Sequence, residues 1–246
     1  MKPSRIFLTA LLALGLAAPS LSGAADAPLR VVTDATFPPM EFYKDGKPTG
    51  FDIELIHALG EEMKRPVELI NIDFKGLIPA IVSGRADAAI SGIYITPERK
   101  NVVDFTDSYY AGGLVVLTKK DSSIKSLKDL DGKKITVQVG TKSVNYLTEH
   151  FPKVNRVEVE KNEEMFNLVK IGRADAAVTG RPAAKLYAQH NPDFTVLDEQ
   201  ITTEEYGIAV SKSQPELRDA LNAALKKLRD NGKYQSIEKK WFEAKS

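Results

Sequence analysis

The chain of 246 residues carries 34 basic and 33 acidic side chains, a formal net charge of +1, and no cysteine. A balanced charge gives no attraction to nucleic acid or to an anionic membrane. The lack of cysteine excludes disulfides, thiolate metal sites and a lipid-bearing cysteine. We therefore expect no nucleic-acid partner and no lipid anchor.

The N-terminus has the composition of a secretory signal peptide at residues 1–25. Lys2 and Arg5 precede an apolar stretch at residues 6–18, and small residues at 22–25 offer a cleavage point after Ala25. The apolar stretch is shorter than the roughly 20 residues that span a membrane. We expect export and cleavage, leaving a soluble periplasmic protein whose length fits one large domain or two small ones.

Strands and helices alternate along the mature chain, a pattern typical of parallel sheets covered on both faces. In the first part, the sequence predicts strands at residues 29–33, 67–72 and 86–91, helices at 52–63 and 76–83, and a short helix after Thr96. A second part with the same order follows residues 127–132, with strands at 134–139, 154–160, 174–179 and 194–197 and helices at 142–150, 163–171 and 182–190. This order predicts the α/β class.

The chain beyond Gly207 changes character. We expect a short strand at residues 208–210, a helix that begins at Pro215 and ends at Asn231-Gly232, and a last amphipathic segment. The apolar stripe of this helix is more often core than a partner surface. Since the second part already has a full set of elements, we expect the tail to return to the first.

One nine-residue phrase occurs twice, as GRADAAISG at residues 84–92 and GRADAAVTG at residues 172–180. Each copy follows a predicted helix and leads into a predicted strand. The repetition predicts two lobes of similar plan: lobe 1 from residues 26–110 plus 207–246, and lobe 2 from residues 111–206, with a hinge near residues 109–113 and 204–207. Because ligands bind at the carboxyl ends of strands in open α/β sheets, two facing lobes predict a cleft.

Arg99 is the first candidate for ligand binding. It lies in the first turn of the short helix that Thr96 begins, where a cation opposes the helix dipole. A bound anion beside Ser91 and Gly92 would explain this placement, since a guanidinium can grip a carboxylate in bidentate geometry. A solvated Arg99, or one paired with an acidic neighbour, is an equal alternative.

Further candidates follow other strand ends. Asp34, Phe37 and Phe74 predict a pocket wall that would receive an ammonium, an amide or an apolar stem, although each aromatic alone is more often core. Gly140-Thr141-Lys142-Ser143 would present backbone N–H groups at a helix start, or form an ordinary turn. The three histidines lack partners at metal spacing, and catalytic and phosphate-binding motifs are absent. We expect no catalytic residue, cofactor or metal.

Taken in order, these residues resemble the periplasmic solute-binding proteins of polar amino-acid ABC importers, the glutamine- and lysine/arginine/ornithine-binding type of family 3. The resemblance covers essentially all of the mature chain. It is carried by Thr33-Asp34, Phe37-Pro38-Pro39, residues 50–55 and 74–80, Ile95-Thr96-Pro97-Glu98-Arg99, Asp104-Phe105, Tyr109-Tyr110, residues 127–133, Gly140-Thr141, residues 206–209 and Lys240-Trp241-Phe242.

The resemblance implies a two-lobed fold that closes on its ligand and delivers it to an inner-membrane permease driven by a separate ATPase. We expect a monomer that is not an enzyme. Arg99 would clamp the α-carboxylate of the ligand, helped by the backbone N–H groups of Tyr94 and Lys142. The Gly92 carbonyl would lie near the α-ammonium. The set of implied ligand-binding residues is Asp34, Phe37, Phe74, Ser91, Gly92, Tyr94, Arg99, Gln138, Thr141, Lys142, Gly180 and Arg181.

Two departures from the family pattern affect the amino end of the ligand. Gly180, followed by Arg181, stands where the family usually carries an aspartate for the α-ammonium, and Tyr94 stands where Ser, Thr or Asp is commoner. An unpaired ammonium in a closed cleft costs several kcal/mol. Either Asp34 or Glu41 replaces the aspartate, or the ligand is an organic acid without an amino group and Arg181 attracts a second anionic group.

Two other functions stay open. The protein would serve a receptor's sensor domain instead of an importer, although the chain carries no signalling domain. A dehydratase-like enzyme on the same scaffold is the less favoured alternative, with Glu41 or Asp34 as its acid or base.

Overall fold

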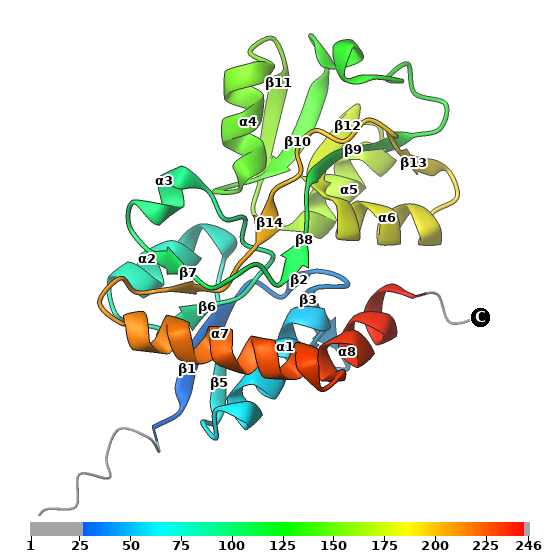
Figure 1. Ribbon diagram of the computed structural model, residues 1–246. Coiled ribbons are helices and arrows are strands. Elements are labelled where there is room, and N and C mark those ends of the chain that lie inside the picture. Colours follow the sequence, from blue (N-terminus) through cyan, green and yellow to red (C-terminus); the bar gives the residue numbers. More distant parts are fainter. Residues whose placement is uncertain (1–26, 244–246) are drawn as a thin grey trace, which may run out of the picture.

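The computed structural model describes residues 27–243 and places them in two lobes, one above the other in Figure 1. The predicted signal peptide lies outside the described residues. Within residues 27–243, no helix has the length and apolar character to cross a membrane.

Lobe 1 is built on a five-stranded sheet. Its strands are β1 (Leu29–Thr33), β5 (Val67–Asn71), β6 (Ala88–Ala89), β7 (Asp104–Phe105) and β15 (Ala209–Val210), in the spatial order β5-β1-β6-β15-β7. β1 runs parallel to β5 and β6, whereas β15 runs antiparallel to β6 and β7. The lobe also contains α1 (Phe51–Glu62), η1 (Phe74–Gly76), α2 (Leu77–Val82), α3 (Pro97–Lys100), α7 (Pro215–Asp230), α8 (Lys233–Phe242) and a small meander of β2 (Thr36–Phe37), β3 (Glu41–Lys44) and β4 (Lys47–Thr49).

Lobe 2 repeats this plan with a second five-stranded sheet. Its strands are β9 (Leu114–Lys119), β10 (Lys134–Gln138), β11 (Asn155–Val159), β12 (Ala176–Gly180) and β13 (Phe194–Val196), in the order β11-β10-β12-β9-β13. β10 runs parallel to β11 and β12, and β9 runs antiparallel to β12 and β13. The helical elements are η2 (Leu127–Leu130), α4 (Lys142–His150), α5 (Asn162–Lys170) and α6 (Arg181–His190). Both sheets are therefore mixed.

The duplicated phrase has the same structural role in both lobes. Gly84 and Gly172 adopt left-handed φ angles of 72° and 73° after α2 and α5, which glycine does at no steric cost. The carboxylate of Asp87 accepts the backbone N–H of Arg30 at 2.9 Å, and Asp175 accepts that of Lys134 at 2.7 Å. Each aspartate thus ties its strand to the neighbouring parallel strand. Most residues of the duplicated phrase therefore stabilise the fold of their lobe.

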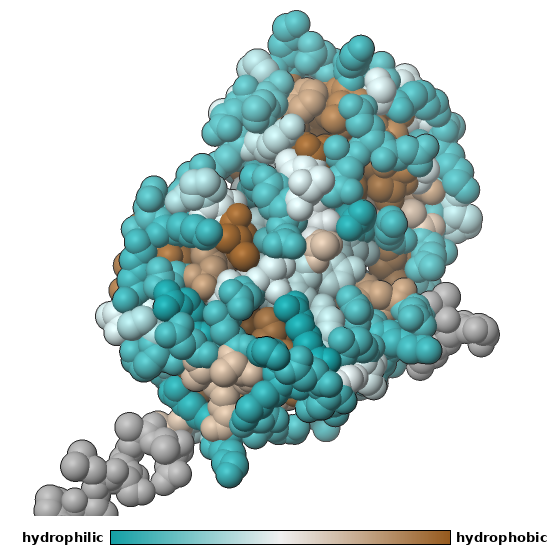
Figure 2. Space-filling model, in the orientation of Figure 1, coloured by the Kyte–Doolittle hydropathy of each residue, from teal (hydrophilic) through white to brown (hydrophobic). Residues whose placement is uncertain are grey.

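Two crossing strands join the lobes. β8 (Tyr110–Ala111) and β14 (Glu205–Tyr206) pair antiparallel between the two sheets (Figure 1). The C-terminal tail then packs on lobe 1, where the Trp241 indole donates to Glu54 of α1 at 3.0 Å. Leucines of the α7 stripe are buried in the core. Figure 2 shows the same face of the molecule covered mainly by hydrophilic residues, with apolar residues in smaller patches.

Candidate ligand-binding site

A small cavity lies where the carboxyl ends of β1, β6, β10 and β12 meet between the lobes. Such a position is where open α/β sheets bind ligands. Nine of the predicted ligand-binding residues line it: Asp34, Phe37, Phe74, Ser91, Gly92, Tyr94, Gln138, Thr141 and Gly180. The sequence did not single out the further lining residues Leu114, Asn162, Met165, Val178, Thr179 and Tyr206; it named Ser143 only within the turn at residues 140–143, and raised Glu41 only as an alternative.

Arg99 does not line this cavity; it lies beside the lining residues Tyr94 and Phe74 and bridges the lobes. Thr96 caps α3 by accepting the Arg99 backbone N–H at 3.3 Å, as the sequence predicts. The guanidinium donates to the Tyr94 carbonyl at 2.9 Å and to the Gly140 carbonyl of lobe 2 at 3.3 Å. It stands 5.6 Å from the centre of the Phe74 ring, and it forms no ion pair with a carboxylate of residues 27–243. Burial lowers the pKa of Arg99 to about 10, and the nearby Glu98 charge offsets only part of this shift.

Lys142 and Arg181 have partners outside the cavity. The Lys142 ammonium forms an ion pair with Glu204. Arg181 donates to the Gln200 side chain at 3.1 Å and to the Ala111 carbonyl at 3.4 Å. It lines a separate surface groove with Tyr110 and Trp241 of lobe 1. Arg181 is the first residue of α6, so the start of this helix sets the direction of its side chain, and its partners lie away from the cavity.

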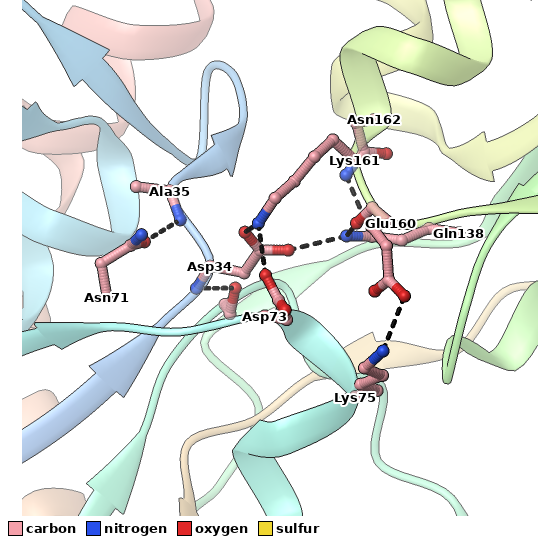
Figure 3. Close-up of polar contacts among 10 residues, drawn as sticks. Asp34, Ala35, Asn71, Asp73, Lys75, Gln138, Glu160, Lys161 and Asn162 are labelled. Carbon is pink, nitrogen blue, oxygen red and sulfur yellow. Dashed lines mark hydrogen bonds and ion pairs between the residues drawn. The ribbon is translucent and has the colours of Figure 1, made fainter.

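One end of the cavity is a charged network that crosses between the lobes (Figure 3). The buried Asp34 carboxylate accepts the Gln138 amide at 2.7 Å and the Lys161 ammonium at 3.2 Å. Lys161 also donates to Asp73 at 2.7 Å. The Asn162 amide fixes Gln138 by donating to its carbonyl oxygen at 2.9 Å. Burial raises the pKa of Asp34, and the Lys161 charge offsets part of this shift.

Aromatic side chains fill the space beside Gly180. A Cβ atom at this position would overlap the Tyr206 hydroxyl and would lie 2.7 Å from the Phe37 ring. Tyr206 donates to the Tyr94 hydroxyl at 3.3 Å, and their ring centres are 4.7 Å apart. Tyr94 and Gly180, the two departures from the family pattern, therefore lie side by side. The closed cavity has no room here for an aspartate side chain.

A buried pair of acids lies behind the same part of the cavity. Glu41 accepts the Ser91 hydroxyl at 2.7 Å, and Asp52 accepts the Gly92 N–H at 2.9 Å and the Tyr109 hydroxyl at 2.8 Å. The second oxygen of each carboxyl lacks any other hydrogen-bond partner, and the two groups lie within hydrogen-bonding reach of each other. Burial raises the pKa of Asp52 to about 6, and burial with the Asp52 charge raises that of Glu41. A single proton shared between them would satisfy both groups and leave one negative charge.

Residues 29–244 match the family of bacterial extracellular solute-binding proteins, family 3. The chain belongs to this family, which confirms the predicted resemblance, the two-lobed α/β fold and the absence of enzymatic function. It is an extracellular solute-binding protein.

Its relatives are named for different amino acids. The chain is 37% identical to the arginine-binding extracellular protein ArtP of Bacillus subtilis (strain 168), covering 85% of this chain and 84% of ArtP. It is 33% identical to the ABC transporter glutamine-binding protein GlnH of the same strain, covering 86% and 79%. A solved structure of an ancestral arginine-binding protein bound to arginine is 41% identical with a TM-score of 0.85, covering 89% of this chain and 99% of that one.

Proposed function

We propose that this protein is the substrate-binding subunit of an ABC importer and captures a polar amino acid by closure of its two lobes. Arg99 carries the proposal. Its guanidinium reaches both lobes through the carbonyls of Tyr94 and Gly140, and lacks a carboxylate partner among the described residues. A ligand α-carboxylate supplies the missing charge with bidentate geometry. Because one ligand then contacts both lobes, its binding favours the closed state.

The buried acid pair supports an amino group on the ligand. Glu41 lines the cavity, and the pair carries one negative charge next to Ser91 and Gly92. Asp34 is less suited to this role, because both of its oxygens already accept from Gln138 and Lys161. In this proposal the α-ammonium faces Glu41, and the charge of the pair replaces that of the aspartate that Gly180 excludes.

A second candidate ligand is a small organic acid without an amino group. The observation that favours it is the packing of Tyr94 and Tyr206 beside Gly180, which leaves lobe 2 without a carboxylate at this point. Arg99 would bind such an acid as it binds an amino acid. The two candidates differ only in their need for the charge at Glu41.

The proposal extends to the partners and the compartment. The protein acts in the periplasm as a monomer, after cleavage of the signal peptide that the N-terminal sequence predicts. It delivers its ligand to a membrane permease that a separate ATPase drives. The family assignment and relatives named as parts of ABC transporters support this role.

A thermal-shift screen with matched pairs tests the proposal. Each amino acid is compared with the same molecule lacking its α-amino group, for example glutamine with glutaramic acid. A ligand that binds only the folded protein raises its melting temperature. We expect the amino acid of one pair to raise it most. A larger shift with the deaminated partner favours the organic acid, and turnover of a tested compound would contradict a binding protein.

A further inference from the structure

Lys161 places a positive charge beside Asp34, at the end of the cavity that would receive the side chain of a ligand whose carboxylate Arg99 holds. Its ammonium lies 3.2 Å from an Asp34 oxygen and 2.7 Å from an Asp73 oxygen (Figure 3). Asp34 belongs to lobe 1 and is 1% exposed, whereas Lys161 precedes α5 in lobe 2 and is 37% exposed. Lys161 thus contacts Asp34 only through the closed interface between the lobes.

Each oxygen of the Asp34 carboxylate already has a partner, so a further cation would have to approach it beside Lys161. One oxygen accepts Lys161 and the other accepts Gln138, which Asn162 holds in place. Burial lowers the pKa of Lys161, but its hydrogen bonds and charge interactions with Asp73 and Asp34 outweigh burial and raise it. The ammonium is therefore charged at neutral pH. A guanidinium or ammonium on the ligand would approach the Asp34 carboxylate, where the Lys161 ammonium already lies. The two positive charges would then repel each other.

We propose that Lys161 determines ligand specificity, because its ammonium occupies the position beside Asp34 that a cationic ligand side chain would take. The site then selects polar amino acids with a neutral side chain, such as an amide, over arginine and lysine. This inference rests on the proposed function and narrows its ligand class. Specificity is a difference of affinities, and an unfavourable charge contact with the wrong ligand increases it.

The lining of the cavity fits a neutral amide. Phe37 and Phe74 offer aromatic faces for an uncharged stem, and the polar lining beside them is neutral, since Gln138, Asn162 and Thr141 are hydrogen-bonded to one another. Lys161 is also held by Asp73, so its ammonium would remain close to a ligand cation that bound Asp34 and would repel it. Two cations would then share the space around one buried carboxylate.

Replacement of Lys161 by methionine tests the inference, with Lys75→Met as the matched control. Lys75 also crosses between the lobes, donating to Glu160 at 2.6 Å, but it does not contact Asp34 (Figure 3). Calorimetry with glutamine, arginine and lysine gives the dissociation constants for the wild type and both variants. Melting temperatures without ligand show that each variant is folded.

We expect the wild type to bind glutamine more tightly than arginine or lysine. Lys161→Met should shift the ratio of the arginine and glutamine dissociation constants toward arginine by about tenfold or more, since one opposing charge is removed. Lys75→Met should leave this ratio within about twofold of the wild type.

Wild-type preference for arginine, or an unchanged ratio in Lys161→Met, would overturn the role of Lys161 and leave the proposed function intact. Failure of the wild type to bind any amino acid, while a deaminated acid binds, would overturn both.

Discussion

Replacement of Arg99 by alanine should remove most ligand affinity and leave the fold intact. In the complex, the α-carboxylate lies at the edge of a closed cavity with Arg99 as its cationic partner. Breaking such a buried pair costs about 3–5 kcal/mol. Because Arg99 is half-buried, we take the lower end, about 3 kcal/mol, which corresponds to roughly a 150-fold weaker dissociation constant.

Calorimetry with the best ligand of the thermal-shift screen measures this loss. Arg85→Ala is the control, because Arg85 is an exposed arginine of the same lobe whose side chain donates to Ser83 at 3.1 Å. The melting temperature of ligand-free Arg99→Ala should stay close to that of the wild type, since the substitution removes two guanidinium hydrogen bonds to carbonyls and keeps the backbone bond to Thr96. An affinity of Arg99→Ala that equals that of Arg85→Ala would refute the carboxylate clamp.

Two further predictions concern the amino end of the cavity. Gly180→Ala should weaken ligand binding by about tenfold, because its Cβ overlaps Tyr206 and Phe37 across the closed cavity. The calorimetric control is Gly76→Ala, whose Cβ would lie 3.5 Å from a methyl group. Equal affinities of the two variants would contradict the packing argument. The raised pKa of Asp52 means that the folded protein binds more protons than the unfolded chain between pH 3.8 and about 6. The contribution of this pair to the free energy of unfolding, measured with urea, should therefore fall as pH rises through that range. Glu41→Gln should reduce that loss, because the amide can donate to Asp52 without a shared proton, and an identical pH dependence in the variant would argue against the coupled pair.

Periodicity and turn chemistry predicted most of the regular elements. The helix predicted at residues 142–150 is α4, and the strand predicted at 29–33 is β1. β9 was missed although its sequence is largely apolar, because β9 follows a crossover and not a predicted helix. The meander of β2, β3 and β4 was missed because its strands are two to four residues long, too short for a periodic pattern.

The cavity lining was predicted where a residue directly follows a strand. Asp34 and Gly92 are of this kind, and backbone topology alone brings such positions together. Tyr206 was missed as a lining residue, although the motif around Gly207 had marked its segment as a crossover. Arg181 was expected to face the ligand, but the direction of its side chain depends on where α6 begins.

The contact of Lys161 with Asp34 could not be predicted from the local sequence. It lies 127 positions from Asp34, and only the closed arrangement of the lobes brings the two charges to 3.2 Å. Around Lys161 the sequence shows a lysine between a strand and a helix, which is ordinary at a protein surface. Selectivity among amino acids depends on such contacts between lobes, and therefore on the three-dimensional structure.

The most direct test of the account is a crystal structure of the protein with its tightest-binding amino acid. We predict that the ligand lies between the lobes with its carboxylate oxygens about 3 Å from the Arg99 guanidinium. A ligand whose carboxylate is held by Arg181 or Lys142, with Arg99 turned to solvent, would contradict the central claim.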